Sequence, residues 1–155
     1  MRKRVALLGF GLVILAGAIA LGIAQTQQTA QQVQRPYTEG SVVFHSYVRT
    51  KPGMFKTYMQ YLQTDWKRYM EELKAAGVVT NYRVLQAPQR TGDDHDLILV
   101  VEHKNMAALD GLNDRLDPIL SRVFGSVPQS DQRFIERGAL RENAGERMYR
   151  ELILK

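Results

Sequence analysis

The chain has 155 residues, of which 45% are hydrophobic and 24% are charged, with no cysteine and a formal net charge of +5 at pH 7. These values are typical of an ordinary globular domain, and they exclude collagen-like, disulfide-stapled and wholly disordered proteins. Three of the positive charges are Arg2, Lys3 and Arg4. Removing these three from +5 leaves +2 on residues 25–155, which is too little to indicate a nucleic-acid-binding face.

Residues 1–24 are predicted to be a signal peptide or an N-terminal membrane anchor. The basic residues are followed by an apolar run from Val5 to Ala24, which ends in the small-residue spacing typical of a cleavage site after Ala24. The run is also 20 residues long, so an uncleaved transmembrane anchor is the alternative. Both alternatives place the residues from Gln25 onward outside the cytoplasm. We therefore expect an exported, periplasmic or otherwise extracytoplasmic protein that contacts the membrane only if the segment is uncleaved.

Residues 25–39 are predicted to be a Gln-rich linker. Six of the ten residues from Gln25 to Gln34 are Gln, and the segment has too little apolar surface to offset the entropy lost on folding. It is either a spacer that holds the domain off the membrane or an unstructured mature N-terminus. The remaining residues, 40–155, have the usual size of a single domain.

The domain is predicted to contain strands and helices in the order βαββαβ, with one extra helix before the last strand. Val42–Val48 is rich in β-branched and aromatic residues, which indicates the first strand. A helix over Met54–Ala76 follows, because apolar residues recur at every third or fourth position. The other predicted elements are strands at 78–86 and 96–103, a helix that Asn105 caps and Asp117-Pro118 interrupts, a short helix capped by Ser130, and a strand at 148–154 that follows Gly145.

This order predicts an α+β, ferredoxin-like fold, in which an antiparallel four-stranded sheet carries its helices on one face. The strand at 96–103 is apolar on both faces, so the face without helices is also expected to be covered. A second copy of the chain is the simplest cover, which predicts a homodimer.

From about Ser41 onward the chain resembles the dimeric α/β barrel proteins. The resemblance rests on Val48–Phe55, on Asp65-Trp66-Lys67 and on Tyr82–Leu85, and it is strongest with exported members that end in a strand like Tyr149–Leu152. It implies a barrel formed by two ferredoxin-like chains. The superfamily includes cofactor-free monooxygenases, haem-degrading enzymes, lactone isomerases and chlorite-decomposing haem proteins, so the resemblance selects neither a reaction nor a cofactor.

Three residues are candidates for catalysis. The alternation of the first strand places His45 and Tyr47 on the face without helices, which would be the lumen of a barrel dimer. His45 is then a candidate proton shuttle or metal ligand, with Tyr47 as hydrogen-bond donor, and the alternative is a satisfied polar network at a dimer interface. His103 is the third candidate. Because His95 and His103 lie about 26 Å apart along one strand, they cannot share an ion, and no metal site is predicted.

A second set of residues is a candidate for ligand binding between the long helix and the sheet. Trp66, the single Trp, either forms a wall of a pocket for a small apolar or aromatic molecule or packs in the core. Phe44 and Tyr69 are expected beside it, and Tyr58 at the entrance. Arg83 pairs with an anionic ligand or with a neighbouring carboxylate.

Three functions follow as hypotheses. The first is an exported small-molecule-binding protein, the second a cofactor-free monooxygenase-like or haem-handling enzyme that uses the same pocket, and the third a non-catalytic tethered interaction module. The sequence has none of the motifs of nucleotide-binding proteins, serine hydrolases or zinc proteases.

Overall fold

The computed structural model describes residues 34–88 and 94–155. The predicted signal or anchor segment, 1–24, and most of the predicted linker lie outside the described residues. Residues Arg35–Lys155 form one compact unit. Its first strand begins at Tyr37, three residues before the predicted domain boundary. No helix in the described residues is long and apolar enough to cross a membrane.

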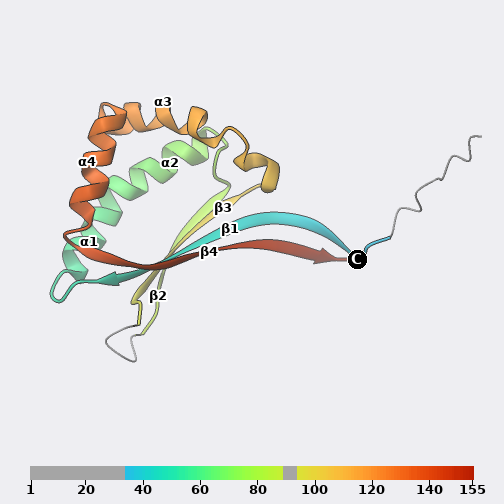
Figure 1. The fold of residues 1–155 in the computed structure, drawn as a ribbon, viewed down its shortest axis with the longest axis horizontal. Helices are drawn as coiled ribbons and strands as arrows, with labels where there is room; N and C mark the ends of the chain where they lie inside the picture. The colour runs from blue at the N-terminus through green and yellow to red at the C-terminus, as the bar shows by residue number, and fades with distance from the viewer. Residues whose placement is uncertain (1–33, 89–93) are drawn as a thin grey trace, which may run out of the picture. The chain divides into compact units, whose positions relative to one another are not determined.

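The sheet has four antiparallel strands in the order β2-β3-β1-β4, which confirms the predicted α+β, ferredoxin-like arrangement. The helices lie on one face of this sheet, and we call the other face the open face (Figure 1). The strands are β1 (Tyr37–Thr50), β2 (Asn81–Gln86), β3 (Leu97–His103) and β4 (Arg141–Leu154).

The predicted long helix is continuous but not uniform. It consists of α1 (Phe55–Tyr61), a π-helical turn (Leu62–Trp66) and α2 (Lys67–Ala75). Its buried stripe faces the sheet and forms a large part of the core, and the predicted spacing is confirmed from Leu62 to Leu73, whereas Phe55 is 38% exposed. The stripe consists of Tyr58, Leu62, Trp66, Tyr69, Met70 and Leu73.

In the second half of the chain, the helices differ from the prediction near Pro118 and near Pro128. A 3-10 turn (Met106–Leu109), capped by Asn105 as predicted, precedes α3 (Leu112–Phe124). The predicted break at Asp117-Pro118 is wrong, because α3 runs through Pro118. A proline inside a helix removes one backbone hydrogen bond, and here the residues after it, including Ile119 and Val123, are buried in the core and stabilise the helix across it.

The cap of α4 (Val127–Arg137) is Ser126, and the predicted cap at Ser130 is wrong. The hydroxyl of Ser126 accepts a hydrogen bond from the backbone N–H of Gln129 at 3.2 Å. Ser130 is instead buried one turn inside the helix, where its hydroxyl donates to the Val127 carbonyl at 2.7 Å. Pro128, in the first turn, is the sequence signal that marks the true start.

The strands β1 and β4 are each 14 residues long. The N-terminal part of β1 and the C-terminal part of β4 pair with each other and extend beyond the helices as a two-stranded ribbon (Figure 1). β4 begins at Arg141, so the prediction that it follows Gly145 is wrong. Gly145 lies inside the strand with φ +126°, beside a shift in register between Tyr47 and Val48 of β1. Several large apolar side chains of β4 are exposed: Met148, Tyr149, Leu152, Ile153 and Leu154.

Candidate functional site

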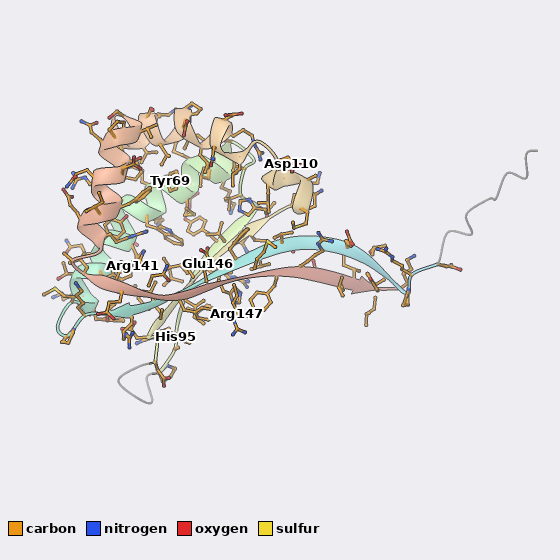
Figure 2. All side chains as sticks on the ribbon, viewed as in Figure 1. Tyr69, His95, Asp110, Arg141, Glu146 and Arg147 are labelled. Carbon is orange, nitrogen blue, oxygen red and sulfur yellow. The ribbon has the colours of Figure 1, made fainter. Side chains whose placement is uncertain are left out.

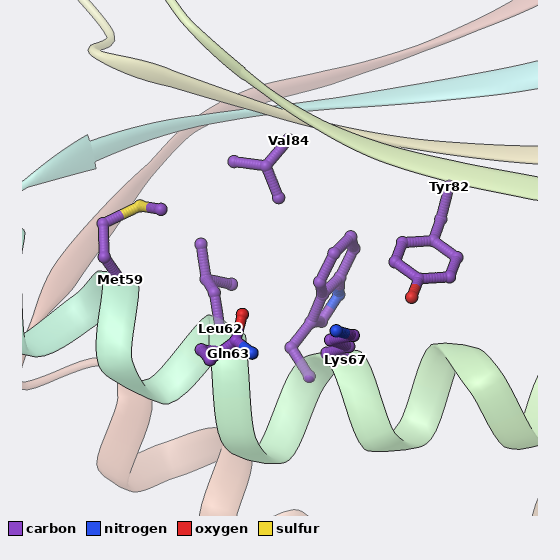
Figure 3. Close-up of a pocket in the computed structure, with 7 residues that line it drawn as sticks. Met59, Leu62, Gln63, Lys67, Tyr82 and Val84 are labelled. Carbon is purple, nitrogen blue, oxygen red and sulfur yellow. The ribbon is translucent and has the colours of Figure 1, made fainter.

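The candidate site is a pocket of about 260 Å³ between the long helix and β2 (Figure 3). Met59 and Leu62 extend from the helix toward Tyr82 and Val84 of β2. Tyr82 and Val84 reach the same face because alternate residues of a strand point to the same side. The full lining consists of Met59, Leu62, Gln63, Trp66, Lys67, Tyr82 and Val84. Gln63 and Lys67 are exposed, so the pocket has apolar walls and two polar side chains on its solvent side.

The π-helical turn forms the helical wall of this pocket. In it the Lys67 N–H donates to the Leu62 carbonyl, five residues back rather than four. Thr64 donates its hydroxyl to the Gln60 carbonyl at 3.0 Å, and such a bond competes with the backbone ladder of the helix. π-helical turns occur frequently at functional sites. The apolar spacing of this segment fits a uniform α-helix equally well, so sequence reasoning missed the turn.

Two aromatic rings meet at the pocket. The rings of Trp66 and Tyr82 pack edge to face, with centroids 5.3 Å apart and planes 87° apart. The Tyr82 hydroxyl donates a hydrogen bond to the Glu71 carboxylate. Burial, together with this bond and the Glu71 charge, raises the pKa of Tyr82 to about 12, so the hydroxyl stays a protonated donor. Sequence reasoning missed Tyr82, although its alternation with Val84 was the available signal.

Of the residues predicted to bind a ligand, Trp66 lines the pocket and the others lie elsewhere. Tyr69 packs in the core against the Phe124 ring at 5.9 Å, and burial raises its pKa to about 12. Phe44 packs edge to face against His103, with centroids 5.6 Å apart. Arg83 pairs with Val100 in the sheet register, which places it on the open face. Tyr58 is fully buried beside Tyr61.

The open face carries a second cluster, formed by two tyrosines and two histidines. The hydroxyls of Tyr47 and Tyr149 lie 3.1 Å apart, and this hydrogen bond raises the pKa of Tyr47. The His45 ring lies 4.9 Å from the Tyr149 ring, and the His95 ring lies 4.8 Å from the Tyr47 ring. Tyr47, His95 and Arg147 also border a shallow hollow of about 420 Å³. In Figure 2, His95 and Arg147 lie on the opposite side of the sheet from Tyr69.

His103 lies on the helix-covered face and is only 6% exposed. Its ring Nδ1 donates to the Val78 carbonyl at 2.8 Å. The structure therefore brings His45 and Tyr47 together but keeps His103 on the other side of the sheet. Among the described residues, no group of three or more His, Asp or Glu side chains is placed to hold a metal ion.

Comparisons with known proteins support the fold. No protein-family model matches the chain, and no curated protein is significantly similar to it. Among solved structures, the crystal structure of HapK from Hahella chejuensis superimposes with a TM-score of 0.51, at 11% identity, over 71% of this chain and 91% of HapK. The chain therefore has a ferredoxin-like fold. A dimeric ferredoxin-like protein from an uncultured marine organism is also similar, at 13% identity and a TM-score of 0.47, over 76% of this chain and 98% of that one.

Proposed function

We propose that this ferredoxin-like chain is an exported, homodimeric binding protein that holds a small apolar or aromatic molecule in the pocket between the long helix and β2. The pocket itself carries the proposal. Its volume of about 260 Å³ exceeds the ~150 Å³ of an engineered cavity that binds benzene, and is slightly below the ~300 Å³ at which pockets for drug-sized ligands begin. A ligand with a single ring fits this volume, and Trp66 and Tyr82 supply aromatic walls for it.

Binding is better supported than catalysis by the position of the polar side chains. The lining of the pocket includes no His, and its charged member, Lys67, is on the solvent side. His45 and Tyr47, which could transfer protons, lie on the open face. An enzyme that used the pocket would therefore lack the acid–base pair that the sequence suggests for it.

The fluorescence of Trp66 provides a direct test, because the chain has a single Trp. We expect saturable quenching or a spectral shift when the protein is titrated with toluene. Val84→Phe, which fills the pocket from the sheet side, should abolish the response. Ile135→Phe is the control, because Ile135 is 71% exposed on α4 and belongs neither to the lining of the pocket nor to the open face. An unchanged spectrum with toluene, or equal loss in the two variants, would contradict binding in the pocket.

The homodimer is proposed from the exposed surface of the sheet. The open face has no helix over it, and Leu85, Tyr149 and Ile153 are each more than two-fifths exposed there in the single chain. A second copy would bury this apolar surface. Sedimentation at micromolar concentration should give a dimer, and Ile153→Glu should shift it toward the monomer. A monomeric wild-type protein would contradict this part of the proposal and leave the pocket unaffected.

Export is proposed from the N-terminal sequence alone. The protein purified from its native host should be found outside the cytoplasm, and its mature N-terminus should be Gln25 if the segment is cleaved. A cytoplasmic protein with an intact N-terminus would contradict export.

A further inference from the structure

A cluster of two tyrosines and two arginines lies where the end of α4 and the start of β4 meet α1. Tyr58 and Tyr61 are on α1, and their rings are stacked with centroids 5.9 Å apart and planes 11° apart. Arg137 is the last residue of α4, and its guanidinium lies over the Phe134 ring at 5.2 Å. Arg141 is the first residue of β4, and Figure 2 shows it at the α1 end of the sheet. We call these four residues the Tyr–Arg cluster.

Each side chain of the Tyr–Arg cluster has a buried polar atom without a hydrogen-bond partner. Tyr58 has no exposed surface at all, and its hydroxyl is unpaired. Three other buried atoms also lack a hydrogen-bond partner: the Tyr61 hydroxyl and the Nε atoms of Arg137 and Arg141. The guanidinium group of Arg137 lies beside the Tyr61 hydroxyl, and that of Arg141 lies beside the Tyr58 hydroxyl. Neither arrangement meets the geometry of a hydrogen bond. More than nine in ten buried polar groups in folded proteins have a partner, so four unpaired atoms in one place indicate a missing acceptor.

The cluster contains two guanidinium groups, and no carboxylate of residues 34–88 or 94–155 forms an ion pair with either of them. Burial and the nearby charge of Arg137 lower the pKa of Arg141, as expected for two cations held close together. The neighbouring acidic side chains already have partners: Asp65 contacts Arg68, Asp96 accepts from Thr50, Glu136 contacts Arg133 and Glu142 contacts Arg49.

All the groups of the cluster are hydrogen-bond donors. Burial raises the pKa of Tyr58 and of Tyr61, which keeps both hydroxyls protonated. A guanidinium has five N–H donors and no acceptor. Arg137 and Arg141 are only partly buried, so an ion can reach them from solvent.

We propose that the Tyr–Arg cluster binds a small oxyanion, such as a carboxylate or phosphate group. The planar guanidinium groups match the paired oxygens of these anions, and charge-assisted hydrogen bonds of this kind are stronger than neutral ones. The anion also supplies the acceptor that the buried hydroxyls lack. This site shares no residue with the lining of the pocket between the long helix and β2. Anion binding at the cluster and ligand binding in the pocket can therefore be tested independently.

The test compares thermal unfolding and calorimetric titration of the full chain with sodium phosphate and with sodium acetate, using sodium chloride at equal ionic strength as the reference. We expect phosphate or acetate to raise the unfolding midpoint in a saturable way while chloride does not, and the more effective anion identifies the class of oxyanion. Binding should weaken about tenfold or more in Arg141→Gln and in Tyr58→Phe, because each removes a donor to a charged group.

The variants separate binding from folding. Tyr58→Phe retains the buried ring and removes an unpaired hydroxyl, so without the anion its midpoint should not fall below that of the wild type. Arg122→Gln is the control, because it removes one positive charge from an exposed side chain of α3 whose partner is Glu72, and it should leave the anion response unchanged. The proposal is overturned if neither anion shifts the midpoint more than chloride does, or if Arg122→Gln loses the response as fully as Arg141→Gln.

Discussion

Replacing Trp66 with Ala is expected to lower the free energy of unfolding by about 3–4 kcal/mol. Trp66 is 7% exposed, so nearly all of its side chain is removed from water. A buried Trp removes roughly 200 Å² from water, which corresponds to about 5 kcal/mol at ~25 cal/mol per Å². The expected value is smaller because one side of the ring borders the pocket and has fewer packing partners to lose.

The assay is urea denaturation followed by circular dichroism, at a fixed protein concentration so that any dimerisation contributes equally. Ile135→Ala is the control, because Ile135 is 71% exposed and its loss should change stability by at most ~0.5 kcal/mol. A loss below ~1 kcal/mol for Trp66→Ala with an unchanged denaturant slope would refute the packing of Trp66 against Tyr82 and the helix wall.

Three further predictions follow from single side chains. The folded-state pKa of Tyr69, about 12, lies above its ordinary value of 10.0, so the stability that the neutral ring contributes is complete below pH 10 and is lost as pH rises through 12. Tyr69→Phe should reduce this alkaline loss in urea titrations, and an identical pH profile would contradict the assignment. Ser126→Ala should cost about 1 kcal/mol through loss of the α4 cap, and no measurable cost would argue against the cap. Gly145→Ala should cost about 1–3 kcal/mol, because φ +126° strains any residue with a Cβ; a neutral effect would mean that the strand relaxes there.

The fold was predictable because its periodic signals are local. The alternation of Val42, Phe44 and Val48 fixes which face of β1 meets the helices, and the three-to-four spacing from Leu62 to Leu73 fixes the buried stripe of the long helix. The ends of elements were less predictable. Tertiary burial carries α3 through Pro118, and pairing with β1 carries β4 back to Arg141 despite Gly145.

The candidate sites were predicted less well than the fold, because they combine residues that are distant in sequence. Trp66 was predicted from its residue type and its position on the helix. Its partner, Tyr82, can be predicted only if one knows which alternate residues of β2 face the helix. Arg83, which lies on the opposite face, was predicted instead. The Tyr–Arg cluster joins α1 to residues about 80 positions later, at the junction of α4 and β4. No spacing rule within one element indicates such a contact.

The ribbon of β1 and β4 also has a consequence for the kinetics of folding. It joins the two ends of the folded unit, since Tyr37 lies opposite Leu154. Pairings this distant in sequence require a large loop to close and are therefore slow to form. During synthesis, β1 is complete long before the C-terminal strand leaves the ribosome. Until residues 141–154 have been made, β1 is an edge strand whose backbone groups are unpaired on the side that β4 later covers, so the growing chain exposes an edge that is prone to aggregation.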